Sequence, residues 1–429
     1  MVFFDPRSSI FYTRLYSGIA RRPSVMTPVS LSFRSFLSDQ YEKVFVRPWP
    51  IIPSAMVIAS LNVFLFAFDR PWTASDGVRN WGDSLFHWLG LVEQPDLLPP
   101  LLYYSGSVLN FGLLLGGMAA ALLSREFAVR LAPLSEIVKG SLGGLLMGWG
   151  AMLAFGCNIG GFFSALAALS ASGLSMMSGL LIGAFLATRY LIRQNRMLID
   201  QGQIPVETAC LAPPKPPPAS TSFRRQPIAG FLLVLFLLVA VFLYRQLDYG
   251  RLASFLLFGV AFSLVFQRSR FCLVNAFREP FMSGQSEHAR AAALALTLNM
   301  IGFVVLKSTD LKDASEWIFP SFWQGGLLGG TLFGVGMVLA GGCGAGSIWR
   351  AGEGHVKLWL AVFFFATGAA MMRQFLVRTD LIRQLGTALF LPQIVDWSVA
   401  VCAVLVLMIL WYMLAGWVEQ RKQAGVLKT

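Results

Sequence analysis

The sequence predicts an all-α, polytopic membrane protein made of two repeats that cross the membrane with opposite polarity. The chain has 429 residues, of which 56% are hydrophobic and only 13% are charged. A soluble domain carries roughly a quarter charged residues, so this composition favours a chain surrounded largely by lipid. Several apolar runs reach the roughly 20 residues that cross a bilayer. One phrase with a single cysteine also occurs twice, which indicates an internal duplication.

The duplicated phrase aligns without a gap. "GGLLMGWGAMLAFGC" (143–157) matches "GGTLFGVGMVLAGGC" (329–343), and the register continues for three more residues. Eight of the matched positions are small residues or cysteine. They are Gly143, Gly144, Gly148, Gly150, Ala154, Gly156, Cys157 and Gly160 in the first copy, and Gly329, Gly330, Gly334, Gly336, Ala340, Gly342, Cys343 and Gly346 in the second.

Hydropathy divides the chain into two membrane regions. The apolar spans lie at about 51–68, 101–123, 140–157, 174–190, 228–246, 252–267, 290–306, 322–342, 358–372 and 394–416. We expect five parts: a basic N-terminal segment (1–50), a first repeat (51–200), a proline-rich linker (201–227), a second repeat (228–416) and a tail (417–429). The linker contains "APPKPPPAS", which cannot be helical.

Charge predicts the orientation. The net charge of +12 lies mainly in loops and tails, where it indicates topology rather than nucleic-acid binding. The N-terminal segment, residues 189–227 and the tail are basic, so both termini are expected in the cytoplasm. The acidic stretch 69–100 should be outside, with an interfacial helix in "DSLFHWLGL". The basic segment 373–393 falls on a predicted outer loop, so it is either outside or re-entrant.

Counting crossings from the cytoplasmic N-terminus gives the two cysteine spans opposite directions. The span that ends at Cys157 runs outward, and the span that ends at Cys343 runs inward. Inverted-topology repeats are a recurrent transporter architecture, in which the substrate site lies near the membrane midplane between the halves.

The five cysteines predict neither a disulfide framework nor a zinc site. They are odd in number and widely spaced, without a C-x-x-C pair, and the chain has only three histidines. We therefore expect no metal and no cofactor. A lone cysteine in a membrane span is usually a small apolar residue, which suits Cys402. Cys210 is expected to be incidental, whereas Cys157 and Cys343 each have a repeat mate and are the functional candidates.

Glycine spacing predicts close packing before each cysteine and a helix break after it. Gly144-x-x-x-Gly148 and Gly330-x-x-x-Gly334 place small residues one turn apart. "GCNIGG" and "GGCGAGS" are too rich in glycine for an ordinary helix. Broken helices at membrane depth line cavities and leave N–H groups free at the next helix start, which suits anions.

Two further segments carry charge beside apolar spans. "QRSRFCLVNAFREPFMSG" (267–284) holds Cys272 and Arg278, and it is either a positive-inside loop or a re-entrant segment. "SIWRAGEGH" (347–355) places Arg350 and Glu353 three residues apart, where one helix face would pair them. Such an ion pair would hold the loop behind Cys343, or Arg350 would face the permeant.

These motifs resemble the YeeE/YedE family of bacterial inner-membrane sulfur-transport proteins. The resemblance rests on "LAFGCNIGGFFSA" (153–165), "RSRFCLVNAFREPFMSG" (268–284) and "LAGGCGAGSIWRAGEG" (339–354), and it covers roughly residues 100–375. The third motif and "NAFRE" are most similar to the YedE branch, which is linked to selenium metabolism. The first half has no "RS-x-FC" segment, so the two halves are not equivalent.

The resemblance implies an hourglass-shaped inverted repeat that takes up thiosulfate through transient S–H contacts. It also implies a small TusA-like sulfur-carrier protein as a cytoplasmic partner. No residue is expected to be catalytic. The expected translocation residues are Cys157, Cys343, Cys272, Asn158, Gly156, Gly342, Arg350, Glu353 and Arg278.

Three hypotheses of different classes remain open. The first is a transporter for thiosulfate or a related inorganic sulfur or selenium species, in the bacterial inner membrane. The second is a membrane thiol enzyme that forms a persulfide, but the sequence offers no histidine near a cysteine as a base. The third is a receptor or scaffold for a cytoplasmic sulfur carrier. No nucleotide-binding motif is present, so direct ATP coupling within this chain is not expected.

Overall fold

The protein is a multi-pass membrane protein built from α-helices. Its structure, a computed structural model, describes residues 33–91, 99–200 and 222–425. Within these ranges nine helices are long and apolar enough to cross a membrane, or ten when the bent pair Leu134–Leu153 and Asn158–Ala167 counts as one span. The number agrees with the ten apolar spans of the sequence. The predicted linker, with Cys210, lies largely in 201–221 and therefore outside the described residues, as do residues 1–32.

The first half runs from α2 to α8. Its elements are α2 (Phe33–Tyr41), η1 (Glu42–Val46), α3 (Ile51–Phe68), α4 (Ser75–Trp88), α5 (Ser105–Leu123), α6 (Leu134–Leu153), η3 (Asn158–Ser164), α7 (Ala165–Ala167) and α8 (Ala171–Asp200).

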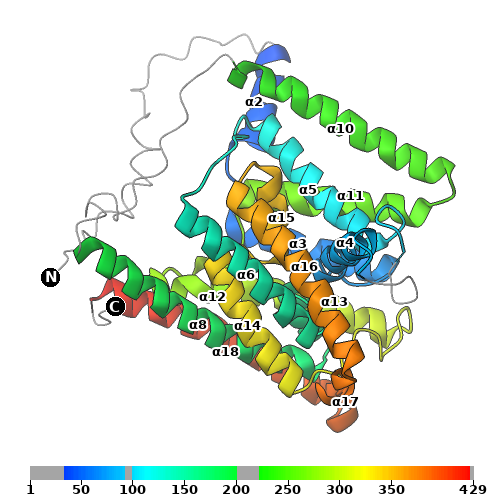
Figure 1. The fold of residues 1–429 in the computed structure, drawn as a ribbon, viewed down its shortest axis with the longest axis vertical. Coiled ribbons are helices and arrows are strands. Elements are labelled where there is room, and N and C mark those ends of the chain that lie inside the picture. Colours follow the sequence, from blue (N-terminus) through cyan, green and yellow to red (C-terminus); the bar gives the residue numbers. More distant parts are fainter. Residues whose placement is uncertain (1–32, 92–98, 201–221, 426–429) are drawn as a thin grey trace.

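The second half runs from α10 to α18. Its elements are α10 (Ser222–Gln246), α11 (Gly250–Ser269), α12 (Leu273–Met282), α13 (Glu287–Ser308), α14 (Gln324–Ala340), α15 (Gly344–Gly352), α16 (Val356–Arg378), η4 (Leu381–Gln384), α17 (Leu391–Ile394) and α18 (Trp397–Gln423). Helices α10 and α18 lie at opposite edges of the molecule (Figure 1), and most of their surface is not covered by protein.

Helices α6 and α14 meet in a close antiparallel contact at the centre of the molecule (Figure 1). A Cβ added at Gly143 would lie 2.6 Å from the Gly336 carbonyl oxygen, and one at Gly150 would lie 2.5 Å from that of Gly329. The contacts run in opposite order along the two helices. Only glycine lets the two backbones approach so closely.

The glycines one turn apart pack against two other helices. A Cβ at Gly148 would lie 2.6 Å from the Ala369 nitrogen of α16, and one at Gly334 would lie 2.8 Å from the Leu180 carbonyl oxygen of α8. The predicted packing role of these glycines is therefore confirmed. Helix α6 packs on α16 and α14 packs on α8; α11 likewise packs on α5, and α3 packs on α13.

The loops gather at two opposite ends of the helices. At one end the Asp69 carboxylate pairs with Arg251 at 2.6 Å, and Lys312 Nζ donates to the Asp69 carbonyl at 2.5 Å. At the other end the Val356 N–H donates to the Arg130 carbonyl at 3.2 Å. Each half therefore contributes loops to both ends.

Two local expectations can be refined. Helix α4 exists and packs against α5 and α16, because Gly77 and Gly82 allow backbone contact with those helices, whereas Trp88 and Leu89 at its end are exposed. Segment 373–393 forms only the short η4 and α17 after α16 ends. Its basic charge is partly matched, because Arg373 lies within electrostatic range of Asp83 and Arg383 lies 3.5 Å from Asp380.

Candidate functional site

Three cysteines stand at three helix breaks. Cys157 is the N-cap residue of η3, Cys272 that of α12 and Cys343 that of α15. Each has an extended backbone, with φ of −76°, −148° and −78° respectively. The two breaks expected from the duplicated phrase are confirmed, and segment 267–284 contains a third rather than a simple loop. Each cysteine thus lies beside the free N–H groups of a helix start.

The residue two positions before each cysteine adopts the left-handed conformation. It is Phe155 with φ 59°, Arg270 with φ 57° and Gly341 with φ 78°. A left-handed residue ends the preceding helix, and the extended cysteine then redirects the chain. Two of the three are not glycine, so the surrounding contacts must hold their backbone in this conformation.

The three thiols are buried and close together. Cys157, Cys272 and Cys343 are 0%, 2% and 4% exposed. The Cys272 and Cys343 side chains interact with each other, and a Cβ added at Gly346 would lie 3.4 and 3.1 Å from their sulfurs. A Cβ at Gly344 would lie 3.5 Å from Cys157 Cβ. Residues far apart in the sequence therefore form one thiol cluster. Cys402 is exposed on α18 and lies apart from it.

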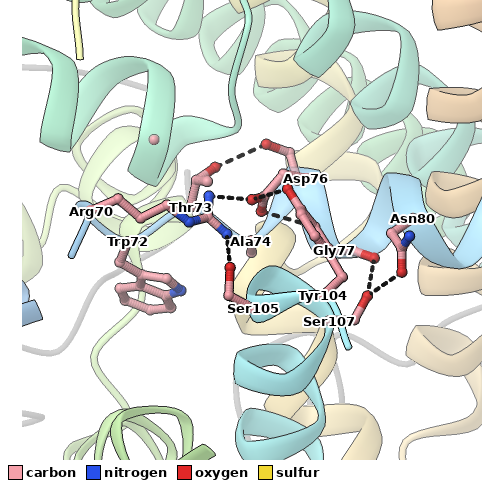
Figure 2. A network of polar contacts seen from close by, with 12 residues as sticks. Arg70, Trp72, Thr73, Ala74, Asp76, Gly77, Asn80, Tyr104, Ser105 and Ser107 are labelled. Atoms are coloured by element: carbon pink, nitrogen blue, oxygen red, sulfur yellow. Dashed lines mark hydrogen bonds and ion pairs between the residues drawn. The ribbon is translucent and has the colours of Figure 1, made fainter. Parts of the chain in front are cut away.

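Cys157 also has two hydroxyl neighbours, one from the segment before α4 and one from the first residue of α4. Its N–H donates to Ser75 Oγ at 3.0 Å, and its sulfur lies 3.8 Å from Thr73 Oγ1. The two hydroxyl oxygens are 3.0 Å apart. Figure 2 shows the segment that carries Thr73 running into α4.

Polar side chains without partners lie beside the cysteines. Asn158 is fully buried, and neither its amide nitrogen nor its amide oxygen has a hydrogen-bond partner. The same is true of Ser347 Oγ on α15. An unpaired buried polar group costs about 1–3 kcal/mol, so these atoms are suited to a polar ligand or to water.

The glycines before the cysteines make room for the returning chain. A Cβ at Gly156 would lie 2.5 Å from the Gly161 nitrogen, and one at Gly342 would lie 2.8 Å from Ser347 Oγ. Both predicted positions therefore border the breaks, where a larger residue would push the cysteine away from its place.

Arg350 supplies positive charge next to the thiols. Its Nη1 donates to the Gly341 carbonyl at 3.1 Å, which ties α15 to the left-handed turn before Cys343. The guanidinium lies within electrostatic range of Cys272 and of His288. Arg278 donates to Asn275 Oδ1 at 3.1 Å, one turn into α12.

The expected Arg350–Glu353 ion pair is wrong. Glu353, which is 1% exposed, pairs with Arg270 at 2.7 Å, and Arg270 also reaches Glu126 at 2.7 Å. The reason is that Arg350 is engaged by Gly341, while the end of α15 points Glu353 at the end of α11. The carboxylate therefore joins two helix breaks rather than one helix face.

His355 follows this ion-pair network in the loop before α16. Arg130 Nη1 donates to His355 Nε2 at 2.9 Å. Burial and the Arg130 charge lower the pKa of His355 to about 4, so the imidazole is neutral at pH 7 and accepts this hydrogen bond.

Sequence reasoning missed Thr73, Ser75 and Arg270. Thr73 and Ser75 lie outside the duplicated phrase and are not cysteines, so neither composition nor spacing pointed to them. Arg270 was visible only as one of several charges in segment 267–284. The first half has no counterpart of the segment that contains Cys272, and asking which residue takes the place of Cys272 there could have pointed to Thr73.

The arrangement of broken helices around buried thiols is matched by a known family. The profile of the family described as "Sulphur transport" matches residues 13–186 and 268–428. The chain belongs to this family. The matched ranges include all three cysteine breaks and most of both halves.

Curated relatives are distant. The chain is 27% identical over 324 residues to the "Probable transporter YedE" of Escherichia coli (strain K12), which covers 73% of this chain and 78% of that protein. It is 35% identical over 125 residues to the "Thiosulfate transporter TsuA" of the same strain, covering 29% and 35% of the two chains. The TsuA of Spirochaeta thermophila (strain ATCC 700085 / DSM 6578 / Z-1203) is 40% identical over 114 residues, covering 27% and 34%. These homologues are named as transporters, which favours a transporter over an enzyme.

Proposed function

We propose that the protein takes up thiosulfate, or a related sulfur or selenium oxyanion, through the cluster of Cys157, Cys272 and Cys343. The observation that carries the proposal is the convergence of three buried thiols at three helix starts. The homology to proteins named as thiosulfate transporters supports it, although that likeness covers about a quarter of the chain. We assign no catalytic residue and no cofactor.

The physical problem of such a substrate is its hydration. A divalent anion cannot enter a low-dielectric region bare, because desolvation costs tens of kcal/mol. Free N–H groups at the starts of η3, α12 and α15 can replace water on the oxygens, and Arg350 adds positive charge nearby. Thiols are soft, weak donors that suit a terminal sulfur and release it readily.

The orphaned polar atoms support a ligand at the same place. Asn158 offers both an amide donor and an amide acceptor beside Cys157, and Ser347 offers a hydroxyl on α15. Gly156 and Gly342 allow the backbone to fold back on itself next to each of the two cysteines. In this proposal Glu353 and Arg278 hold the surrounding helix ends rather than the anion.

We further propose that the halves 51–200 and 228–416 are inverted-topology repeats with an hourglass outline. The antiparallel contact of α6 with α14 and the corresponding helix pairs support this arrangement. Arg189, Arg193 and Arg196 at the end of α8, with the basic end of α18, favour cytoplasmic termini in a bacterial inner membrane. A TusA-like carrier would then receive the sulfur species at that face.

The decisive experiment is uptake of labelled thiosulfate by the purified protein in liposomes, compared with sulfate, sulfite and selenite. We expect thiosulfate uptake by the wild type, and background uptake by Cys157→Ala and by Cys343→Ala. Cys402→Ala is the matched control, because that thiol is exposed on α18. Full uptake by a folded Cys157→Ala/Cys343→Ala double variant would rule out the thiol pathway.

One observation favours a second candidate, a persulfide-forming protein. Cys272 and Cys343 lie side by side, which the sequence did not predict. A thiolate attacking the terminal sulfur of thiosulfate would form an S–S bond and release sulfite, giving a cysteine persulfide. Mass spectrometry of the protein after incubation with thiosulfate would detect the added sulfur atom. Uptake with no persulfide and no released sulfite would favour the transporter.

A further inference from the structure

The segment between α3 and α4 forms a fourth break that enters the thiol cluster. Helix α3 ends at Phe68, and α4 starts after its N-cap residue Ala74. The Ala74 Cβ lies 3.8 Å from the position that a Cβ on Gly344 would take. This segment therefore touches the start of α15, directly after Cys343.

The fourth break occupies the place in the first half that Cys272 occupies in the second. Cys272 is the N-cap residue of α12, and its side chain meets Cys343. In the first half, Thr73 precedes the N-cap residue of α4, and its hydroxyl meets Cys157. Each central sulfur thus has one neighbour from the preceding break of its own half. That neighbour is a soft thiol in one case and a hard hydroxyl in the other.

The hydrogen bonds around Thr73 leave its hydroxyl able to donate to a ligand. The Thr73 and Ser75 hydroxyls are 3.0 Å apart and either can donate to the other, while Ser75 Oγ also accepts the Cys157 N–H. With Ser75 as the donor, the Thr73 proton is available to the Cys157 sulfur or to a ligand bound beside it. Thr73 and Ser75 are both buried, and Asn158 with its unpaired amide follows Cys157 directly.

A network of polar contacts holds the segment in place (Figure 2). Arg70 binds the Asp76 carboxylate and donates to Ser105 Oγ at 3.0 Å, and the Tyr104 hydroxyl donates to Asp76 at 2.8 Å. The Ala74 carbonyl accepts from Asn110 at 2.9 Å. The Thr73 hydroxyl is therefore pre-positioned, which lowers the ordering cost of binding an anion there.

We propose that Thr73 is a substrate-binding residue that donates a hydrogen bond to an oxygen of the permeating anion at Cys157. A hydroxyl is a stronger donor to oxygen than a thiol, whereas the Cys272–Cys343 pair suits a terminal sulfur or selenium atom. The first half then binds an oxygen at one end of the anion, and the second half binds the sulfur or selenium atom at the other end. The substrate class is an oxyanion that carries one terminal chalcogen, and sulfate lacks the soft end. This inference rests on the proposed function.

The test compares Thr73→Val, which keeps the shape, with Thr73→Ser, which keeps the hydroxyl. Labelled thiosulfate uptake into liposomes is measured over a concentration series, with unlabelled sulfate as competitor. We expect Thr73→Val to raise the half-saturating thiosulfate concentration about tenfold, the scale of one hydrogen bond to a charged group, and Thr73→Ser to stay within about twofold. Sulfate should compete equally poorly against all variants.

Thr73→Cys carries the same test if valine is not accommodated, because a thiol donates weakly to oxygen. We expect it to raise the half-saturating concentration as valine does, and thermal melting in detergent checks that each variant is folded. Wild-type half-saturation in folded Thr73→Val or Thr73→Cys would overturn the role of Thr73 and leave the proposed function standing. Absence of thiosulfate uptake by the wild type would instead overturn the proposed function.

Discussion

Cys157 and Cys343 end nearly the same glycine-rich phrase, but the segments that follow them form different helices. After Cys343 the chain enters the α-helix α15, and the Cys343 sulfur accepts the Gly346 N–H at 3.2 Å. After Cys157 the chain enters the π-helix η3, and the sulfur makes no such cap but lies beside Thr73. The glycines before the cysteine reproduce the break in both halves, whereas the neighbours decide what each thiol can do.

A second comparison concerns two arginines, Arg70 in the break between α3 and α4 and Arg270 in the break between α11 and α12. Arg270 lies two residues before Cys272 and pairs with Glu353, and Arg70 lies four residues before Ala74 and pairs with Asp76. Both ion pairs hold a broken helix against its neighbours. Glu353 is more deeply buried than Asp76, so the two halves should differ in their sensitivity to the loss of the arginine.

The largest expected effect tests what the two halves share. Gly148→Leu and Gly334→Leu should each abolish folding, because the added side chain meets the Ala369 backbone in one case and the Leu180 backbone in the other. Gly416→Leu on α18 is the matched control, because nothing lies within 4 Å of a Cβ there. Yield and size-exclusion profile in detergent measure the result. A folded Gly334→Leu protein would show that the α14–α8 contact is looser than described.

The next prediction contrasts the two arginines. Arg270→Met leaves Glu353 buried without its main partner and should lower the free energy of unfolding by about 2 kcal/mol, less than for a fully buried pair because Arg270 itself is 43% exposed. Arg70→Met should have a smaller effect, because Asp76 keeps hydrogen bonds from Tyr104 and from the Gly77 N–H. Denaturation by SDS in mixed micelles measures both. Equal losses would mean that the breaks are equally dependent on their ion pairs.

A smaller effect separates the two central cysteines. Serine is a good N-cap residue, and Cys343 already caps α15 with its sulfur. Cys343→Ser should therefore keep or raise stability by about 0.5 kcal/mol, whereas Cys157→Ser should bring no gain because Cys157 caps nothing. Melting temperatures of the two variants give the comparison. A gain in Cys157→Ser alone would reverse the assignment of the capping thiol.

The smallest expected effect concerns the loss of stability at acidic pH. The pKa of His355 is lowered to about 4 by burial and by Arg130, against about 6.5 in an unfolded chain. Between these values the unfolded chain binds a proton that the folded protein does not, so stability falls as the pH falls from about 6.5 toward 4. His355→Gln removes this titration and can still accept from Arg130. The loss of melting temperature between pH 7 and pH 5 should therefore be smaller in the variant, and an equal loss would contradict the prediction.

Much of the architecture was accessible from the sequence because glycine spacing acts directly on the backbone. The duplicated phrase predicted two helix breaks, and the glycines one turn apart predicted close packing; both were confirmed. The position of Cys272 against Cys343 could not be predicted, because it depends on how α11 packs on α5 and α15. The same reason explains why Glu353 was assigned to Arg350, its neighbour in sequence, rather than to Arg270.

The first-half hydroxyls were inaccessible for a different reason. Thr73 lies in a connection of several residues between α3 and α4, Ser75 is the first residue of α4, and Cys272 lies in a connection of three residues. The difference in length hides the proposed correspondence of the two connections from any gapless alignment. Charge reasoning also left segment 373–393 ambiguous, since the position of Arg373 near Asp83 is a property of the packed helices.

The glycine contacts of α6 have a consequence for how the chain is made. Gly143 and Gly150 contact α14, and Gly148 contacts α16, so the closest backbone contacts of this first-half helix are all with helices synthesised later. The close backbone packing of α6 therefore forms only once α14 and α16 have been made, so we expect the centre of the molecule to be completed after synthesis of the second half.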